Sequence, residues 1–226
     1  MVVELSRFDQ DVRGTLTQFI AREGRAPSHA TVSDTLGCSI SEVEASLDRL
    51  HATHSLLLHP HVRRVWVVHP FALTAGSCWV QTPDRGYWAN CLYCGLGIAA
   101  ALGSDAVIST RIGGEGEAIQ VEVSGGAVVR GAELLFHLST PVARWWENVI
   151  AACASFQPFR SVNDVDAWCA RHDLPLGHVM NMEQLVAFAG DWYGDYVQKP
   201  WRKRTPDETR SLFASHGFVS PFWEIG

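Results

Sequence analysis

The chain opens with apolar side chains spaced three and four residues apart, the period of a helix with one buried face. The positions on this face are Phe8, Val12, Leu16, Phe19 and Ile20. The pattern predicts an amphipathic helix over residues 7–23 that ends near Gly24, because glycine readily adopts the left-handed conformation that closes a helix.

Polar caps predict two more helices directly after the first. Ser28 can cap a short helix that Gly37 ends, because a serine hydroxyl accepts hydrogen bonds from the free amide groups at a helix start. Ser39 or Ser41 can cap a third helix, with Glu44 at capping-box distance from Ser41. Three helices at this spacing indicate a helix-turn-helix.

Two short β-prone runs follow and predict a hairpin wing. The runs LLLHP and RRVWVVHPF are separated at His59-Pro60-His61, a typical turn between strands. We therefore expect a winged helix over residues 1–75. These residues carry seven Lys and Arg against eight Asp and Glu, so they lack the basic face that binds phosphate. DNA is not the expected partner, and a structural or partner-facing role is favoured.

Beyond a Gly-Ser junction near residues 71–82, strands alternate with helices. Short β-prone runs at 78–80 and 86–88 lead into the Ala-rich run 91–102. We predict that this run is a buried helix that Asn90 caps and Gly103 ends.

The remainder of the chain predicts a mostly antiparallel sheet with flanking helices. Glycines separate the runs VISTRI, EAIQVEV and AVVRG, and LLFHLS follows, so tight turns can join these strands. Residues 143–159 fit either helix or strand, and helices are predicted at 162–172, 182–193 and 205–216. The fold class is therefore α+β, with a second domain over residues 76–226.

Composition excludes several classes of protein. A net charge of −6 and a pI near 5.9 disfavour a general attraction to nucleic acid or to anionic membranes. No apolar stretch approaches the roughly 20 residues that span a bilayer, and the start lacks the apolar core of a secretory signal. Six cysteines without regular spacing fit reduced thiols better than disulfides. We expect a cytoplasmic protein.

Two cysteines lie where a helix begins. Cys91 and Cys94 stand three residues apart, so their thiols share one helical face and can act on one atom. A helix start stabilises negative charge and is expected to favour the thiolate, which is both a nucleophile and a soft-metal ligand. This spacing alone also fits redox exchange or half of a zinc site. Cys38, Cys78 and Cys169 fit small buried hydrophobic residues.

The motif YWANCLYCGLGI at residues 87–98 resembles the first active-site helix of the organomercurial (alkylmercury) lyases. The stretch ACAS at 152–155, followed by FRS at 159–161 and VDAWC at 165–169, resembles the second cysteine segment of that family. The tail, from WYGD at 192–195 onward, is similar to actinobacterial-type members. The resemblance covers nearly the whole chain, because the lyases also carry a winged-helix-like front.

The resemblance implies protonolytic cleavage of a carbon–mercury bond by two cysteines and an aspartate, without an organic cofactor. It implies an organomercurial or other small-molecule substrate, with small thiols or mercuric reductase as metal acceptors. The first cysteine of the family falls on Cys91 and the second on Cys153. The aspartate position is occupied by Cys94, which departs from the family pattern.

Two functions follow from this departure. In the first, Cys91 and Cys153 capture mercury as catalytic and metal-binding residues, and Cys94 replaces the carboxylate as proton donor or ligand. The alternative is a non-catalytic or repurposed member that binds Hg, Cu or Zn through the three thiols. A metal or redox sensor built on the winged helix, and an enzyme with another substrate, are further hypotheses.

Other side chains could serve a thiol centre, although capping, solvated or packing roles explain them more simply. The carboxylates are Asp105 and Asp195. The histidines are His137, His172 and His178. Tyr93 and Trp88 could line the space for an organic group, with core packing as the simpler role.

Overall fold

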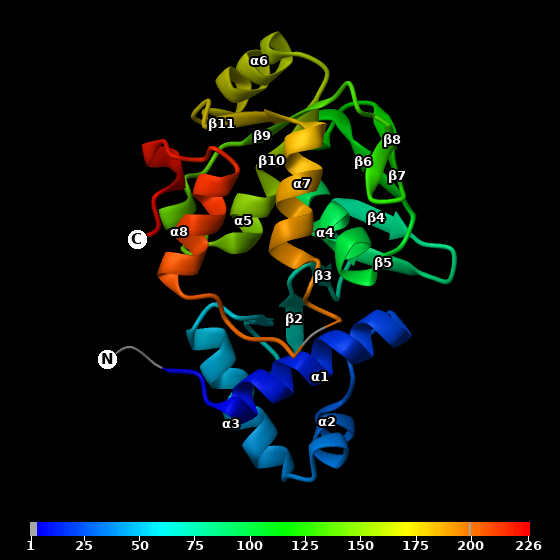
Figure 1. The fold of residues 1–226 in the computed structure, drawn as a ribbon, viewed down its shortest axis with the longest axis vertical. Helices are drawn as coiled ribbons and strands as arrows, with labels where there is room; N and C mark the ends of the chain where they lie inside the picture. Colours follow the sequence, from blue (N-terminus) through cyan, green and yellow to red (C-terminus); the bar gives the residue numbers. More distant parts are fainter. Residues whose placement is uncertain (1–3, 199) are drawn as a thin grey trace.

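The computed structural model describes residues 4–198 and 200–226. Its first part consists of α1 (Arg7–Glu23), α2 (His29–Leu36) and α3 (Ile40–Ala52), followed by the antiparallel strands β1 (Leu57–Leu58) and β2 (Val65–Val68). Figure 1 shows the three helices gathered at one end of the molecule, with β2 leading into the remainder. Helices and hairpin occur in the predicted order.

The helix caps of this part differ from the prediction at one point. Ser28 caps α2 and Ser39 caps α3. The capping box of α3 pairs Ser39 with Glu42, so the box predicted from Ser41 and Glu44 is wrong. The reason is that α3 begins at Ile40, which places the third helical position on Glu42.

A buried carboxylate joins α1 to α3. Asp9 is fully buried and accepts hydrogen bonds from Ser46 Oγ at 2.7 Å and Arg49 Nη2 at 2.7 Å. Burial by itself would raise the pKa of Asp9, but the hydrogen bonds from Arg49, Ser46 and Ser6 outweigh it and lower the pKa to about 2. The two helices are therefore held by a charged clasp as well as by apolar packing.

The main sheet has eight strands in the order β1-β2-β3-β5-β4-β6-β7-β8, and every neighbouring pair is antiparallel. Its further strands are β3 (Phe71–Ala72), β4 (Cys78–Gln81), β5 (Gly86–Ala89), β6 (Ala106–Arg111), β7 (Ala118–Ser124) and β8 (Ala127–Arg130). The hairpin β1-β2 is thus part of the same sheet as the strands that follow residue 75. The segment expected as a junction contributes strands β3 and β4.

A smaller sheet and the later helices complete the molecule. In this three-stranded sheet β9 (Leu135–Leu138) lies between β10 (Phe156–Phe159) and β11 (His178–Asn181), which was not predicted. The later helices are α5 (Val149–Ala154), α6 (Val162–His172), α7 (Met182–Tyr193) and α8 (Pro206–Ser215). The short 3-10 turns are η1 (Ile112–Gly114), η2 (Val142–Arg144) and η3 (Pro221–Trp223). Residues 143–159 contain both helix and strand, and the predicted α+β class with a mostly antiparallel sheet is confirmed.

Helix α4 (Leu92–Leu102) lies at the centre and packs along α7 (Figure 1). Two glycines permit this packing. A side chain at Gly97 would meet the ring of Tyr193 at 2.3 Å, and one at Gly95 would meet Ile108 at 3.1 Å. Gly103 closes the helix in a left-handed conformation, as predicted.

The start of α4 differs from the prediction, because Cys91 occupies the cap position and its side chain makes no capping hydrogen bond. The predicted Asn90 cap is wrong, since the first helical residue is Leu92 and Asn90 lies one residue too early.

Among the described residues, no helix combines the length and apolarity needed to cross a bilayer.

Candidate thiol centre

The first two thiols come from the start of α4. Cys91 and Cys94 are separated by one helical turn, and Cys91 Sγ donates a hydrogen bond to Cys94 Sγ at 3.7 Å. Both residues are buried, with 0% and 1% of their surface exposed. The three-residue spacing alone predicted that these two thiols lie close together.

The third thiol comes from α5, about 60 residues later in the chain. Cys153 is buried, and its sulfur lies within 4.8 Å of the Cys94 sulfur. Its thiol is also close enough to Cys91 to influence the pKa of that residue. The short helix that carries it starts at Asn148, whose side chain accepts from Ala151 N at 3.1 Å. The structure therefore brings together the three cysteines that the resemblance selected.

The protonation of these thiols differs from the sequence expectation. Burial raises the pKa of Cys91 well above its usual value. Hydrogen bonding with Cys153 raises the pKa of Cys94, and hydrogen bonding with Cys91 raises that of Cys153. The expectation that the helix start favours the thiolate is wrong here. Loss of solvent opposes ionisation of Cys91, and the neighbouring thiols oppose ionisation of Cys94 and Cys153. All three groups are thiols near neutral pH.

A histidine joins the thiols from the turn after β2. One ring nitrogen of His69 and the sulfurs of Cys94 and Cys153 all lie within 4.8 Å of one another. His69 Nε2 is buried and has no hydrogen-bond partner. Burial, together with the nearby Arg13 charge, lowers the pKa of His69 to about 4, so the imidazole is neutral near pH 7. The sequence analysis missed this residue, since a single histidine at a strand end carries no spacing signal.

Helix α1 holds the backbone of His69 in place. Arg13 is buried and donates from Nη2 to the His69 carbonyl at 3.1 Å and from Nε to the Ser55 carbonyl at 2.8 Å. Its guanidinium lies 4.0 Å from the ring centre of Trp201. The ring of His69 meets the edge of Trp146, with centroids 5.6 Å apart. The first helix thus positions a residue of the thiol centre.

Comparison with known proteins agrees with this geometry. The sequence model of the alkylmercury lyase family, MerB, matches residues 71–194, which is more than half of the 226 residues.

The chain belongs to the alkylmercury lyase family.

The fold is likewise similar to a solved structure described as the mercury-bound form of MerB2, with a TM-score of 0.68 and 19% sequence identity. The match covers 86% of this chain and 93% of that chain. A comparison with curated proteins gives no significant match. The likeness to MerB2, which was solved in its mercury-bound form, therefore supports the fold.

Aromatic rings border the thiols of this alkylmercury lyase family member. Tyr93 stacks on Phe188 with ring centres 5.0 Å apart and lies 5.3 Å from the ring of Tyr193. Its hydroxyl is buried without a hydrogen-bond partner. Tyr93 is therefore a core residue, packed in the same apolar cluster as Cys94.

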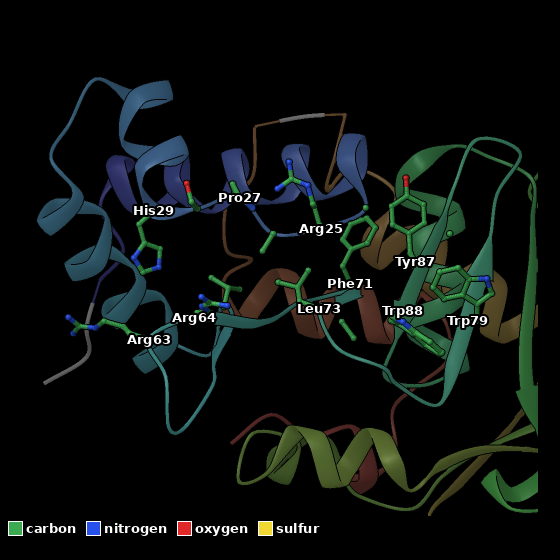
Figure 2. A pocket seen from close by; sticks show the side chains of 16 residues that line it. Arg25, Pro27, His29, Arg63, Arg64, Phe71, Leu73, Trp79, Tyr87 and Trp88 are labelled. Atoms are coloured by element: carbon green, nitrogen blue, oxygen red, sulfur yellow. The ribbon is translucent and has the colours of Figure 1, made fainter.

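Trp88 belongs to a different surface. With Trp79, Arg25 and Arg64 it lines a groove of about 780 Å³ between the α1-α2 connection and strands β2, β3 and β5 (Figure 2). Successive side chains of a strand point to opposite faces, so Trp88 and Ala89 face opposite ways. A role for Trp88 beside the thiols does not fit its position.

The remaining candidates have local roles outside the thiol centre. Asp105 accepts hydrogen bonds from Ser124 Oγ and Gly125 N in the turn after β7, and Asp195 is exposed. His137 contacts the Leu176 carbonyl at 2.7 Å, His172 pairs with Glu115, and His178 packs on Trp223. Cys169 lies 3.7 Å from His137, Cys38 is half-buried, and Cys78 is buried on β4. Burial raises the pKa of Cys78 to about 11.

Proposed function

We propose that this protein cleaves carbon–mercury bonds by protonolysis, with Cys91, Cys94 and Cys153 as its chemical centre. The observation that supports the proposal is the meeting of three buried thiols at the start of α4 and on α5, with Cys91 hydrogen-bonded to Cys94 and Cys153 within 4.8 Å of Cys94. Thiolate sulfur is the ligand type that a soft metal prefers. Family membership supports the substrate class.

Capture begins with thiol exchange. An organomercury ion reaches the site as its adduct with a small thiolate. Cys91 forms the new sulfur–mercury bond, while the small thiolate leaves and takes the Cys91 proton. Neutral thiols suit this step, since no charge has to be buried before the metal arrives. The apolar surroundings of Cys91 and Tyr93 favour an apolar organic group.

Protonolysis then requires a second sulfur and a proton. Cys153 binds the mercury as a thiolate, which increases electron density on the metal and makes the departing carbon more basic. Cys94 gives its proton to that carbon and receives the proton of Cys153. The carbon–mercury bond breaks, its electron pair enters the new carbon–hydrogen bond, and mercury remains on Cys91 and Cys153. The short separation of the Cys94 and Cys153 sulfurs, within 4.8 Å, supports this relay.

The second candidate is a soft-metal binding protein without catalysis. It is favoured by one observation, the thiol of Cys94 at the position where the family resemblance has a carboxylate. Three thiolates around one ion retain it tightly, and tight retention opposes turnover.

The deciding experiment follows benzene and protein-bound mercury together. Reduced protein is incubated without oxygen with phenylmercury and an excess of small thiol, beside Cys91→Ser, Cys94→Ser and Cys153→Ser. Cys169→Ser is the matched control, because Cys169 is a buried thiol in a separate apolar cluster. Repeated benzene release that requires Cys91 and Cys153 supports the lyase. Stoichiometric mercury capture without benzene favours the second candidate.

A further inference from the structure

The nitrogen of His69 lacks the partner that a buried polar atom normally has. Its Nε2 is enclosed without a hydrogen bond, whereas most buried polar atoms in proteins are satisfied. An unsatisfied buried acceptor costs about 1–3 kcal/mol. A buried nitrogen without a partner, on a ring that lies beside two thiols, is a candidate donor for a metal ion.

The donor spacing fits a tetrahedral ion. Ligands of zinc lie ~3.5–4 Å apart, because Zn–S and Zn–N bonds are about 2.3 and 2.0 Å long. The sulfurs of Cys91 and Cys94 are 3.7 Å apart. A His69 ring nitrogen and the sulfurs of Cys94 and Cys153 lie within 4.8 Å of one another. Cys91 lies outside this group of three but adjoins it through Cys94, so it offers a fourth donor next to the cluster.

We propose that His69 completes a site of one nitrogen and three sulfurs, with Cys91, Cys94 and Cys153, for a borderline divalent cation such as Zn(II). The inference rests on the proposed function and adds a divalent cation as a second ion that the thiol centre binds. Such an ion competes with the organomercurial for the same sulfurs. The N-terminal part, through the turn after β2, then supplies a ligand to the centre.

The chemistry of the donors separates this ion from mercury. Imidazole suits zinc and cobalt, while mercury is softer and is satisfied by thiolates. When the divalent ion binds, the three thiols release their protons to solvent and the resulting thiolates neutralise its charge. His69 therefore matters for a borderline cation and is dispensable for mercury held by Cys91 and Cys153.

Arg13 and Trp146 orient the proposed ligand. The guanidinium of Arg13 fixes the His69 carbonyl at 3.1 Å, and the indole of Trp146 packs against the imidazole. A ligand that is held before the ion arrives loses less entropy on binding. His54 stacks on the same indole, with ring centres 5.0 Å apart, but it is not part of the donor cluster.

The test titrates reduced full-length protein with Co(II) alone, without oxygen, and records its ligand-field and sulfur-to-cobalt absorption bands. The variants are His69→Ala and His69→Cys. His54→Asn is the matched control, since asparagine tolerates the left-handed backbone at φ 59° that His54 adopts.

We expect the wild type and His54→Asn to bind one Co(II) with intense tetrahedral bands. His69→Ala should weaken cobalt binding at least about tenfold, since even indirect partners of a metal ligand contribute about 10- to 100-fold. His69→Cys should bind cobalt with a stronger sulfur-to-cobalt band, which reports the replaced donor and shows that the variant folds.

Two results overturn the proposal. One is unchanged cobalt affinity and spectrum in both His69 variants, and the other is the absence of tetrahedral cobalt in the wild type. Mercury capture and benzene release are measured in parallel on the wild type and on the control His54→Asn, which should match each other. These measurements test the lyase proposal separately from the metal-site proposal. Loss of cobalt binding therefore does not count against benzene release, and loss of benzene release does not count against cobalt binding.

Discussion

Strand β5 separates the thiol centre from the paired indoles of Trp79 and Trp88, which line the groove drawn in Figure 2. On one face Ala89 pairs with Cys78, a thiol close enough to Cys94 and Cys153 to influence their pKa values. On the other face Trp88 is 37% exposed and lines an open groove of about 780 Å³. The thiol centre is buried and contains several reactive groups close together, whereas the groove is open and no cysteine lines it.

The difference teaches that open volume and chemistry are separate signals. The groove contains surface arginines and indoles that are already packed or solvated, as Trp79 and Trp88 are against each other at 4.9 Å. The thiol centre contains groups whose partners are one another, together with a nitrogen that has none. Unsatisfied and mutually bonded reactive groups locate the chemistry in this molecule better than a hollow does.

The largest expected effect distinguishes a variant of the thiol centre from a variant of the groove. Cys153→Ser removes the second thiolate, so retention of Hg(II) against excess small thiol should fall about a hundredfold to ten-thousandfold through loss of chelation. Trp88→Ala should leave retention unchanged. Equilibrium dialysis with mercury analysis measures both. Equal losses in the two variants would contradict the separation.

A second change sharpens the role of Cys94. Cys94→Asp restores the carboxylate that the family resemblance implies, and benzene release from phenylmercury should rise about a hundredfold, the lower range for general acid catalysis. The matched variant Cys94→Asn has similar size without the acid and should show no gain. No difference between Asp and Asn would remove the proton-donor role.

A third test uses the raised thiol pKa values. Only the thiolate reacts with iodoacetamide, so alkylation of Cys91 and Cys153 at pH 7 should be slow. As the pH is increased toward the pKa of these thiols, the alkylation rate should rise about tenfold per pH unit. The half-buried Cys38 provides the internal comparison. Peptide mass spectrometry of timed samples gives the rates. Alkylation of Cys91 as fast as that of Cys38 at pH 7 would contradict a buried thiol centre.

The smallest effect on chemistry is expected from the clasp between α1 and α3. A pKa lowered from 3.8 to about 2 for Asp9 corresponds to about 2 kcal/mol of stability. The lowered value means that this contribution is full above about pH 4 and is lost as the pH falls through 2.

Asp9→Asn should therefore lower the free energy of unfolding by about 2 kcal/mol at pH 7 and leave mercury stoichiometry unchanged. Urea unfolding at several pH values measures this effect. If wild type and variant lose stability in parallel between pH 4 and pH 2, the clasp does not depend on the Asp9 charge.

Local sequence rules predicted the elements that local interactions determine. Ser28 and Gly103 cap helices as expected, and the three-residue spacing placed Cys91 beside Cys94. The same rules failed by one residue at Asn90, because several polar residues near a helix start can satisfy the pattern and only packing selects the first turn.

The rest of the site depends on contacts between distant segments. The local sequence around Cys153 gives no reason to place it beside Cys94, and only the family resemblance selected it. His69 needed the pairing of β2 with β3 and the hydrogen bond from Arg13 to reach the thiols. The protonation of Cys91 was also out of reach, because desolvation is a property of the packed fold and not of a helix start.

The sheet that joins β2 to β3 and β3 to β5 has an evolutionary consequence. A gene rearrangement that exchanged the first 75 residues for another helical unit would also exchange His69 and cut the sheet beside the strand that leads to Cys91. Such an exchange would therefore remove the imidazole beside Cys94 and Cys153, whereas substitutions elsewhere in the N-terminal part leave that imidazole in place.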